Sequence, residues 1–205
     1  MEYALESLSW QSCYKLLSGA VVPRPIGWVS TLDEAGRPNL APFSFFTVVC
    51  AAPPTVLFCP MVRGSDGARK DTLRNVRATG EFVVNIVTET LLERMNLTSA
   101  ELPAGESEFA FAGLTPIPSA VVRPLRVAES PIHLECRVQQ VIEISDQPGG
   151  GSIVIGEVVH LHVDDALLAA EDKIDPQALH AVGRLGGPWY CRAEAEIPLK
   201  RPSLE

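Results

Sequence analysis

The amino-acid sequence predicts a mainly β fold, an antiparallel barrel with a few short helices. Six separate stretches are rich in β-branched and aromatic residues, whereas helix-like stretches are fewer. The strand-like stretches follow one another across turn residues and do not alternate with helices, which disfavours a Rossmann fold. With 205 residues, 46% of them hydrophobic and 20% charged, the chain is expected to fill one core as a single domain, 1–205.

The six predicted strands are recognised by composition and by the turns around them. Pro42 lies inside the second stretch and indicates an edge strand or a bulge, because proline cannot donate to the ladder. The last two stretches are long, and the turn QPGGGS between them predicts a hairpin. The predicted strands are residues 26–32, 40–50, 55–60, 81–87, 131–144 and 153–163.

Three short helices are predicted, at residues 71–80, 88–99 and 176–182. Gly80 is the expected C-terminal stop of the first, and Pro176 suits the first turn of the third. A long, turn-rich connection at 99–130 joins the two halves of the chain.

Composition excludes several classes of protein. A formal net charge of −8 argues against nucleic acid as a partner, since binding to its backbone needs a basic face. No apolar run is long enough for a membrane span. The first ten residues carry two glutamates and lack the basic cluster that begins a secretory signal. Five cysteines without a C-x-x-C pair favour neither a disulfide framework nor a zinc site, so we expect a cytoplasmic protein.

A cluster of cations interrupts this acidic chain at residues 63–77. The segment carries five Lys and Arg residues against two Asp residues. Its centre, GARKDTLRN, stands at a predicted helix start, where unpaired N–H groups and the helix dipole favour a phosphate. We expect Arg69, Lys70 and Thr72 to face the anion. Asp71 would cap the helix or orient the loop, and a capped surface helix without a ligand is the alternative that this segment leaves open.

Other polar residues are weaker candidates. Ser30 and Thr31 place two hydroxyls at the end of an apolar strand, and Asn39 follows the next turn; a solvent-facing position is the ordinary alternative for each. His160 and His162 are two residues apart and share a strand face, a spacing that metal sites also use, although solvent-facing histidines are commoner. No G-x-S-x-G, Walker or G-x-G-x-x-G motif occurs, so we assign no catalytic side chain and no metal ligand.

Seven segments, in order, resemble the flavin reductase-like family of FMN-binding split-barrel proteins. The resemblance covers about residues 14–192, most of the chain, and rests on the combination of segments, because none is specific alone. They read RPIGWVST, GRPNLAPFSFF, PPTV, RKDTLRN, TGEFVVNIV, IGEVVHLHVDD and VGRLGG followed by WY.

The resemblance implies a six-stranded Greek-key split barrel that forms a homodimer and holds FMN without a covalent bond. It places the FMN phosphate against Arg69, Lys70 and Thr72. Ser30 and Thr31 would bond the phosphate or ribityl chain. The isoalloxazine would be bordered by backbone at Asn39, Leu40, Ala41, Pro42, Phe43 and Ser44, and approached by Arg184 and Tyr190 from the C-terminal motif.

The implied function is an FMN-dependent oxidoreductase that takes hydride from NADH or NADPH and reduces free flavin, a metal chelate or another small acceptor. One departure bears on the donor. Several flavin reductases of this family carry a G-D-H-type turn whose histidine lies near the nicotinamide, and here that turn reads PGGGSIVIG. An FMN-binding electron carrier with little turnover and an oxidase of the pyridoxamine-phosphate type are the alternatives.

Overall fold

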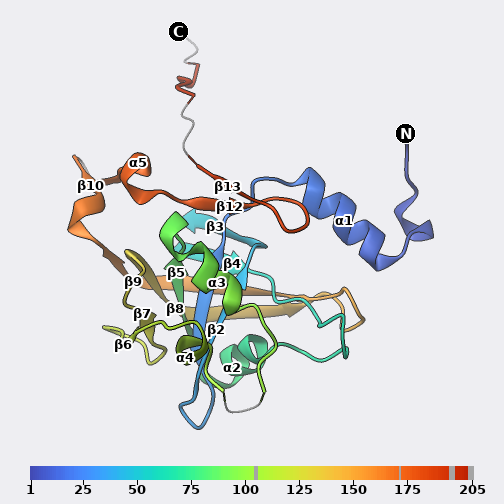
Figure 1. The fold of residues 1–205 in the computed structure, drawn as a ribbon, viewed down its shortest axis with the longest axis horizontal. Helices are drawn as coiled ribbons and strands as arrows, with labels where there is room; N and C mark the ends of the chain where they lie inside the picture. Colours follow the sequence, from blue (N-terminus) through green and yellow to red (C-terminus); the bar gives the residue numbers. More distant parts are fainter. Residues whose placement is uncertain (104–105, 171, 194–196, 203–205) are drawn as a thin grey trace.

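The computed structural model describes residues 1–103, 106–170, 172–193 and 197–202, and one large antiparallel sheet dominates it (Figure 1). The strand order is β2-β1-β5-β8-β9-β4-β3. These strands are β1 Gly27–Leu32, β2 Pro38–Phe43, β3 Phe46–Ala51, β4 Pro54–Phe58, β5 Glu81–Ile86, β8 Ile132–Glu143 and β9 Ser152–Val163. The predicted mainly β fold is therefore confirmed.

The sheet holds seven strands because one predicted stretch is two strands. Residues 40–50 break at Ser44 and Phe45, and the Phe45 carbonyl accepts a hydrogen bond from the Cys59 N–H at 2.8 Å as the chain turns. Pro42 lies in β2 at the edge of the sheet, as its missing donor predicts.

The remaining elements are short. The small strands form three two-stranded ladders and are β6 Pro116–Ile117, β7 Arg126–Val127, β10 Leu168–Ala169, β11 Lys173–Ile174, β12 Val182–Arg184 and β13 Tyr190–Arg192. The α-helices are α1 Trp10–Ala20, α2 Asp71–Thr79, α3 Leu92–Leu97, α4 Glu108–Phe111 and α5 Pro176–Leu179. Single 3₁₀ turns are η1 Leu5–Ser7, η2 Glu89–Leu91 and η3 Asp165–Leu167. The predicted helix 88–99 is divided between η2 and α3, and α1 was not predicted.

Two hydrophobic clusters lie on opposite faces of the sheet. Along β1, Trp28 belongs to the cluster under α3 and α4, whereas the next residue, Val29, belongs to the cluster that α2 closes with Leu73 and Val76. This is the two-residue alternation of a strand buried on both faces. Burial on both faces fixes the register of β1, and with it the polar residues at its end.

Helix α2 is held against β1 and β2 by its apolar face and by two polar contacts. Asn75 Nδ2 donates to Thr31 Oγ1 at 3.0 Å, and Asn39 Nδ2 donates to Thr72 Oγ1 at 3.0 Å. Gly80 ends the helix with a positive φ of 71°, as predicted. These contacts fix the position of the helix start beside β2.

The expectation that Asp71 caps this helix is wrong. The N-cap residue is Lys70, with extended backbone at φ −62° and ψ 147°, and Asp71 is the first helical residue. The Asp71 carboxylate instead pairs with Arg74 one turn later and with Arg63 at 3.4 Å. An ammonium group cannot accept a hydrogen bond, so the Lys70 side chain does not cap the helix. The Leu73 N–H donates to the Lys70 carbonyl at 3.0 Å, and no side chain caps the N–H groups of Asp71 and Thr72.

Within the described ranges, none of the helices combines the length and the apolar character needed to cross a bilayer.

Candidate functional site

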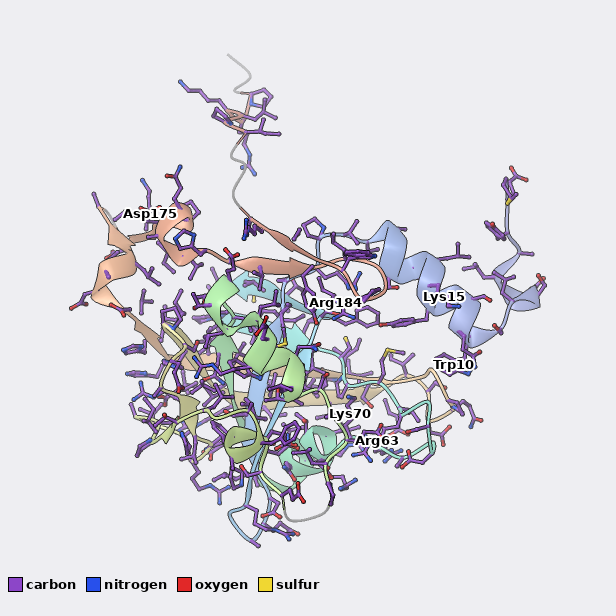
Figure 2. All side chains as sticks on the ribbon, in the orientation of Figure 1. Trp10, Lys15, Arg63, Lys70, Asp175 and Arg184 are labelled. Carbon is purple, nitrogen blue, oxygen red and sulfur yellow. The ribbon has the colours of Figure 1, made fainter. Side chains whose placement is uncertain are left out.

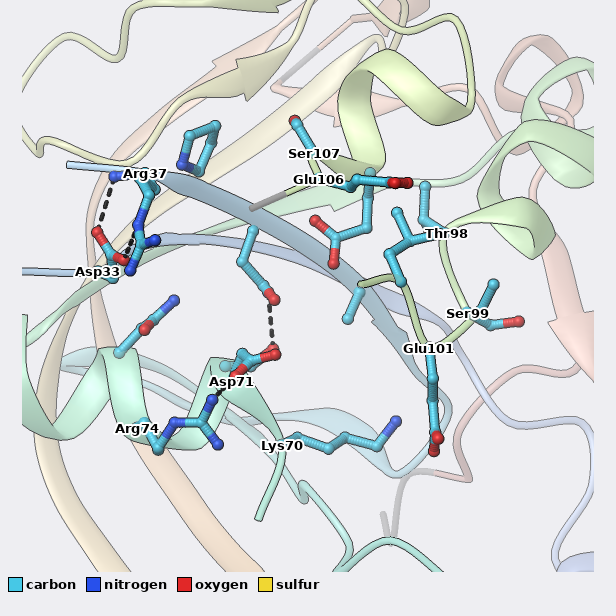
Figure 3. A pocket seen from close by; sticks show the side chains of 18 of the residues that line it. Asp33, Arg37, Lys70, Asp71, Arg74, Thr98, Ser99, Glu101, Glu106 and Ser107 are labelled. Carbon is cyan, nitrogen blue, oxygen red and sulfur yellow. Dashed lines mark hydrogen bonds and ion pairs between the residues drawn. The ribbon is translucent and has the colours of Figure 1, made fainter. Parts of the chain in front are cut away.

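A cavity of about 500 Å³ lies beside the start of α2 (Figure 3). Its walls come from the β1–β2 turn and β2, from the chain around the start of α2, and from the segment that leads into α4. The lining residues are Asp33, Arg37, Pro38, Asn39, Ala41, Arg63, Lys70, Asp71, Thr72, Arg74, Asn75, Thr98, Ser99, Ala100, Glu101, Leu102, Pro103, Glu106, Ser107 and Glu108.

Most charges around this cavity are paired within the protein. Arg37 pairs with Asp33 at 2.7 Å. Arg63 lies 3.4 Å from Asp71 and 4.0 Å from Glu101. The cation cluster that the sequence shows at 63–77 is therefore largely neutralised, partly by carboxylates from distant segments.

Lys70 is the exception among the cavity cations. Among the residues that the structure describes, it takes part in no ion pair, and its amino group points into the space between α2 and the wall that carries Glu101 (Figure 3). Burial lowers the pKa of the Lys70 amino group below its usual value, the positive charge of Arg63 lowers it further, and Glu101 opposes both. A desolvated and unpaired ammonium is stabilised by any anion that enters the cavity.

A second, smaller cavity of about 160 Å³ adjoins the first and shares Lys70 with it. The Lys70 amino nitrogen lies 5.8 Å from the centre of the Phe43 ring, on the wall between the two spaces. Aromatic and sulfur-containing side chains make up most of the lining. The lining residues are Tyr14, Pro42, Phe43, Ser44, Phe45, Cys59, Met61 and Lys70.

The structure brings seven of the predicted site residues to these two cavities. Asn39, Ala41, Lys70 and Thr72 line the larger cavity, and Pro42, Phe43 and Ser44 join Lys70 around the smaller one. Leu40 lies in the same strand with its side chain in the core, while its N–H donates to Glu108 Oε2 at 3.2 Å.

Of the six predicted residues that line neither cavity, three others lie on β1 or beside α2. Ser30 is buried and its hydroxyl donates to the Leu125 carbonyl on the opposite face of the sheet. Thr31 faces α2 but its hydroxyl accepts from Asn75. Arg69 turns outward, and its guanidinium pairs with Glu143 at 2.6 Å.

Arg184 and Tyr190 belong to the β12–β13 hairpin, which lies apart from Lys70 (Figure 2). The Arg184 guanidinium carbon lies 4.4 Å from the centre of the Tyr190 ring, and the Tyr190 hydroxyl donates to Asn96 at 3.2 Å. Their link to the smaller cavity is Arg24, whose guanidinium donates to the Leu185 carbonyl at 3.0 Å and to Ser44 Oγ at 3.4 Å.

Sequence reasoning missed the acidic wall of the larger cavity and the far side of the smaller one. Glu101, Glu106 and Glu108 reach the site from a connection that carried no motif. Burial raises the pKa of the Glu108 carboxyl above its usual value, and the Leu40 N–H opposes the shift. A capping signal existed for α1, since Ser9 Oγ accepts from the Ser12 N–H at 3.2 Å, and α1 supplies Tyr14.

The two histidines of β9 lie elsewhere. His162 Nδ1 lies 3.1 Å from Nδ1 of His133, and His160 Nδ1 lies 3.7 Å from the buried Glu135 carboxylate. Among the described residues, no group of three or more His, Cys, Asp or Glu side chains is arranged to hold a metal ion.

Comparison with known proteins identifies the family. Residues 18–182 match the model of the flavin reductase like domain. The structure of nitrilotriacetate monooxygenase component B from Bacillus cereus is 35% identical with a TM-score of 0.91, covering 97% of this chain and 98% of that chain. That of 2-nitrobenzoate 2-nitroreductase from Pseudomonas fluorescens is 32% identical with a TM-score of 0.88, covering 99% and 97%.

A third structure, from Shewanella frigidimarina, is described as a flavin reductase with a split barrel domain. It is 24% identical with a TM-score of 0.84, covering 98% of this chain and 100% of that chain. The likeness confirms the predicted split barrel. With its family match and this fold, the chain belongs to the flavin reductase-like family.

Proposed function

We propose that this chain is an FMN-dependent oxidoreductase that takes hydride from NADH or NADPH and reduces a small acceptor. The whole chain, 1–205, acts as one flavin-binding domain. Membership of the flavin reductase-like family supports flavin binding, and the two more similar structures belong to a monooxygenase component and a nitroreductase. A small organic acceptor or free flavin is the class of substrate that these relatives favour.

The observation that carries the proposal is the unpaired Lys70 ammonium at the start of α2. A phosphate placed there would accept hydrogen bonds from Lys70 and from the N–H groups of Asp71 and Thr72, which no side chain caps. Thr72 adds a hydroxyl to the same wall. These donors fit the phosphate of FMN, which only accepts hydrogen bonds at its charged oxygens.

The ring system would lie along residues 39–44, where β2 passes from the larger cavity to the smaller one. Pro42, Phe43 and Ser44 border the smaller cavity and supply both backbone groups and an aromatic wall. The flavin, when bound, supplies the hydride chemistry, and the residues of this chain bind it, orient it and exclude water. The predicted contacts of Ser30, Thr31, Arg69, Arg184 and Tyr190 belong to the same proposal.

We propose a homodimer in the cytoplasm. Large apolar side chains stay exposed on β3 and on the β12–β13 hairpin, where Val48 is 66% and Trp189 70% exposed. A second copy of the chain would cover such surfaces, and light scattering on a sizing column measures this directly.

The five cysteines are all free thiols, as expected in a reducing compartment.

An electron carrier with little turnover is the second candidate. It is favoured by the β8–β9 turn, which holds Gly149, Gly150 and Gly151 and no histidine for a nicotinamide. Anaerobic mixing of the FMN-loaded protein with NADH and with NADPH separates the two. Rapid bleaching of the visible flavin absorbance with either donor supports the reductase, and bleaching only with a strong chemical reductant supports the carrier.

The binding site is tested by titrating FMN into apoprotein and following the quenching of flavin fluorescence. Lys70→Ala should weaken binding by about tenfold to a hundredfold, because a charge-assisted hydrogen bond contributes about 1.5–3 kcal/mol. Arg69→Ala tests the other predicted cation. Arg77→Ala is the matched control, since Arg77 also pairs with Glu143, at 2.8 Å, and lines neither cavity. Wild-type protein that binds no FMN would reject the proposed function.

A further inference from the structure

One face of helix α1 carries three residues that reach the rest of the protein, and the middle residue of that face lines the smaller cavity. Trp10, Tyr14 and Ser18 are spaced four residues apart and so lie on one side of the helix. Of its eleven residues only Ser18 is buried, at 2% exposed. The helix is therefore held by a few specific contacts and not by an apolar stripe in the core.

Trp10 holds the N-terminal end of α1, the lower end of the helix in Figure 2, where this residue is labelled. Its indole packs on two glycines of the loops below. A Cβ on Gly149 would lie 2.6 Å from indole Cε3, and one on Gly64 would lie 3.0 Å from Cη2. Any side chain at Gly149 would displace the indole. Trp10 therefore packs directly on the glycine-rich β8–β9 turn.

The C-terminal end of α1 is held by the buried guanidinium of Arg24. It donates to the Ser18 carbonyl and, at 2.9 Å, to the Val21 carbonyl. Carbonyls at a helix C-terminus lack intrahelical partners and carry the negative end of the dipole, so a cation is favoured there. The same guanidinium donates to Ser44 Oγ, on the wall of the smaller cavity.

Between these two anchors, Tyr14 lies against the smaller cavity. Its ring centre is 6.3 Å from that of Phe45, at a tilt of 44°. Phe43 and Met61 also line the cavity, which therefore has aromatic and thioether walls that pack well against a flat π-system. Its volume of about 160 Å³ leaves room for one end of a planar ring system.

We propose that Tyr14 is a ring-binding residue: it stacks on a flat aromatic ring in the smaller cavity, and α1 is anchored at Trp10 and Arg24 to hold it there. The inference rests on the proposed function, which supplies two such rings, one end of the isoalloxazine and the nicotinamide. Both offer the same flat π-surface to Tyr14.

The test uses three variants of the full-length protein. Tyr14→Leu keeps apolar bulk and helix propensity but removes the ring, and Tyr14→Phe restores it. Tyr3→Leu is the matched control, because Tyr3 is exposed and lines neither cavity. Tyr14 is itself 40% exposed, so none of these changes removes a core residue, and circular dichroism verifies the fold.

Loss of the stacking should change binding by about twofold to tenfold. If the ring is the flavin, Tyr14→Leu raises the FMN dissociation constant by this factor, and Tyr14→Phe restores it. If the ring is the nicotinamide, FMN binding is unchanged and the apparent dissociation constant of NADH in anaerobic flavin reduction rises instead. Wild-type values for both ligands in Tyr14→Leu would overturn the inference while leaving the proposed function standing. Absence of FMN binding in wild-type protein rejects the proposed function itself.

Discussion

Asn39 Nδ2 donates a hydrogen bond to Thr72 Oγ1 across 3.0 Å, and the direction of this bond decides what the hydroxyl can offer. An amide nitrogen only donates, so Thr72 accepts and its own proton is left to donate. Thr72 is almost fully buried, at 1% exposed, on the wall of the larger cavity. A buried donor facing this space is matched by a ligand that only accepts, as a phosphate does.

The first prediction follows from that proton. Thr72→Val keeps the shape of the side chain and removes the donor. It should weaken FMN binding by about tenfold to a hundredfold, since a hydrogen bond to a charged group contributes about 1.5–3 kcal/mol. Thr72→Ser retains the hydroxyl and serves as the control. Equal FMN dissociation constants for the two variants, measured by flavin fluorescence, would exclude a direct role of this hydroxyl.

The second prediction concerns the contact that holds α2 on β1. Thr31→Val removes the acceptor of the Asn75 amide, and both residues are buried. The free energy of unfolding should fall by about 1–3 kcal/mol, the cost of an unsatisfied buried donor. Urea titration followed by circular dichroism measures it. An unchanged midpoint would mean that the Asn75 amide finds another partner.

The third prediction is a loss of stability in mild acid that originates at His133. The His133 Nε2 lies 2.8 Å from the Val127 carbonyl, so Nε2 carries the proton and Nδ1 accepts from His162. Burial lowers the pKa of His133 to about 4, Arg126 and His162 contribute to the lowering, and the Val127 carbonyl opposes it.

The sign follows from proton uptake. Between about pH 6.5 and pH 4 the unfolded chain binds a proton at this residue and the folded chain does not, so stability falls as the pH falls, by about 3 kcal/mol in all. Urea midpoints measured across this range should show the slope. His133→Gln should flatten it, whereas His180→Asn, a change that suits the left-handed backbone at φ 48°, should leave it intact.

The fourth prediction contrasts two glycines. A Cβ on Gly156 would lie 2.4 Å from the buried Phe82 ring, so Gly156→Ala should destabilise the fold by about 1–3 kcal/mol. Gly19 lies inside α1, and among the described residues nothing comes within 4 Å of a Cβ built there. Gly19→Ala should therefore stabilise the protein, by up to about 1 kcal/mol. Thermal unfolding of the two variants gives opposite shifts if this packing is correct.

The sequence predicted the sheet well because its strands are specified locally. Residues 81–87 and 131–144 carry their own pattern, and each became a strand within a residue or two, as β5 and β8. The end of helix α2 at Gly80 was also specified locally, because the left-handed backbone that ends the helix there favours glycine. The break at Ser44 was missed because both flanking segments have strand composition, and only the contact of Phe45 with Cys59 marks it.

Charge around the site could not be predicted, because it depends on partners distant in sequence. Arg69 finds Glu143 at 2.6 Å, across 74 positions of the chain, and Glu101 comes to the cavity from a segment without a pattern. A sequence window therefore showed a cationic cluster at 63–77, and within that described segment the fold leaves Lys70 as the cation without an ion pair. Helix α1 was missed for a related reason, because the contact that holds it, between Trp10 and Gly149, joins residues far apart in the sequence.

The buried Arg24 has a consequence for how this protein can be shortened. One guanidinium ties the end of α1, the segment before β13 and the rim of the smaller cavity together, through Val21, Leu185 and Ser44. The part of the chain that matches the family model, 18–182, excludes Tyr14 and most of the C-terminal hairpin. A fragment trimmed to those borders would keep the barrel strands but lose one wall of the smaller cavity, so terminal deletions should impair ligand binding before they unfold the sheet.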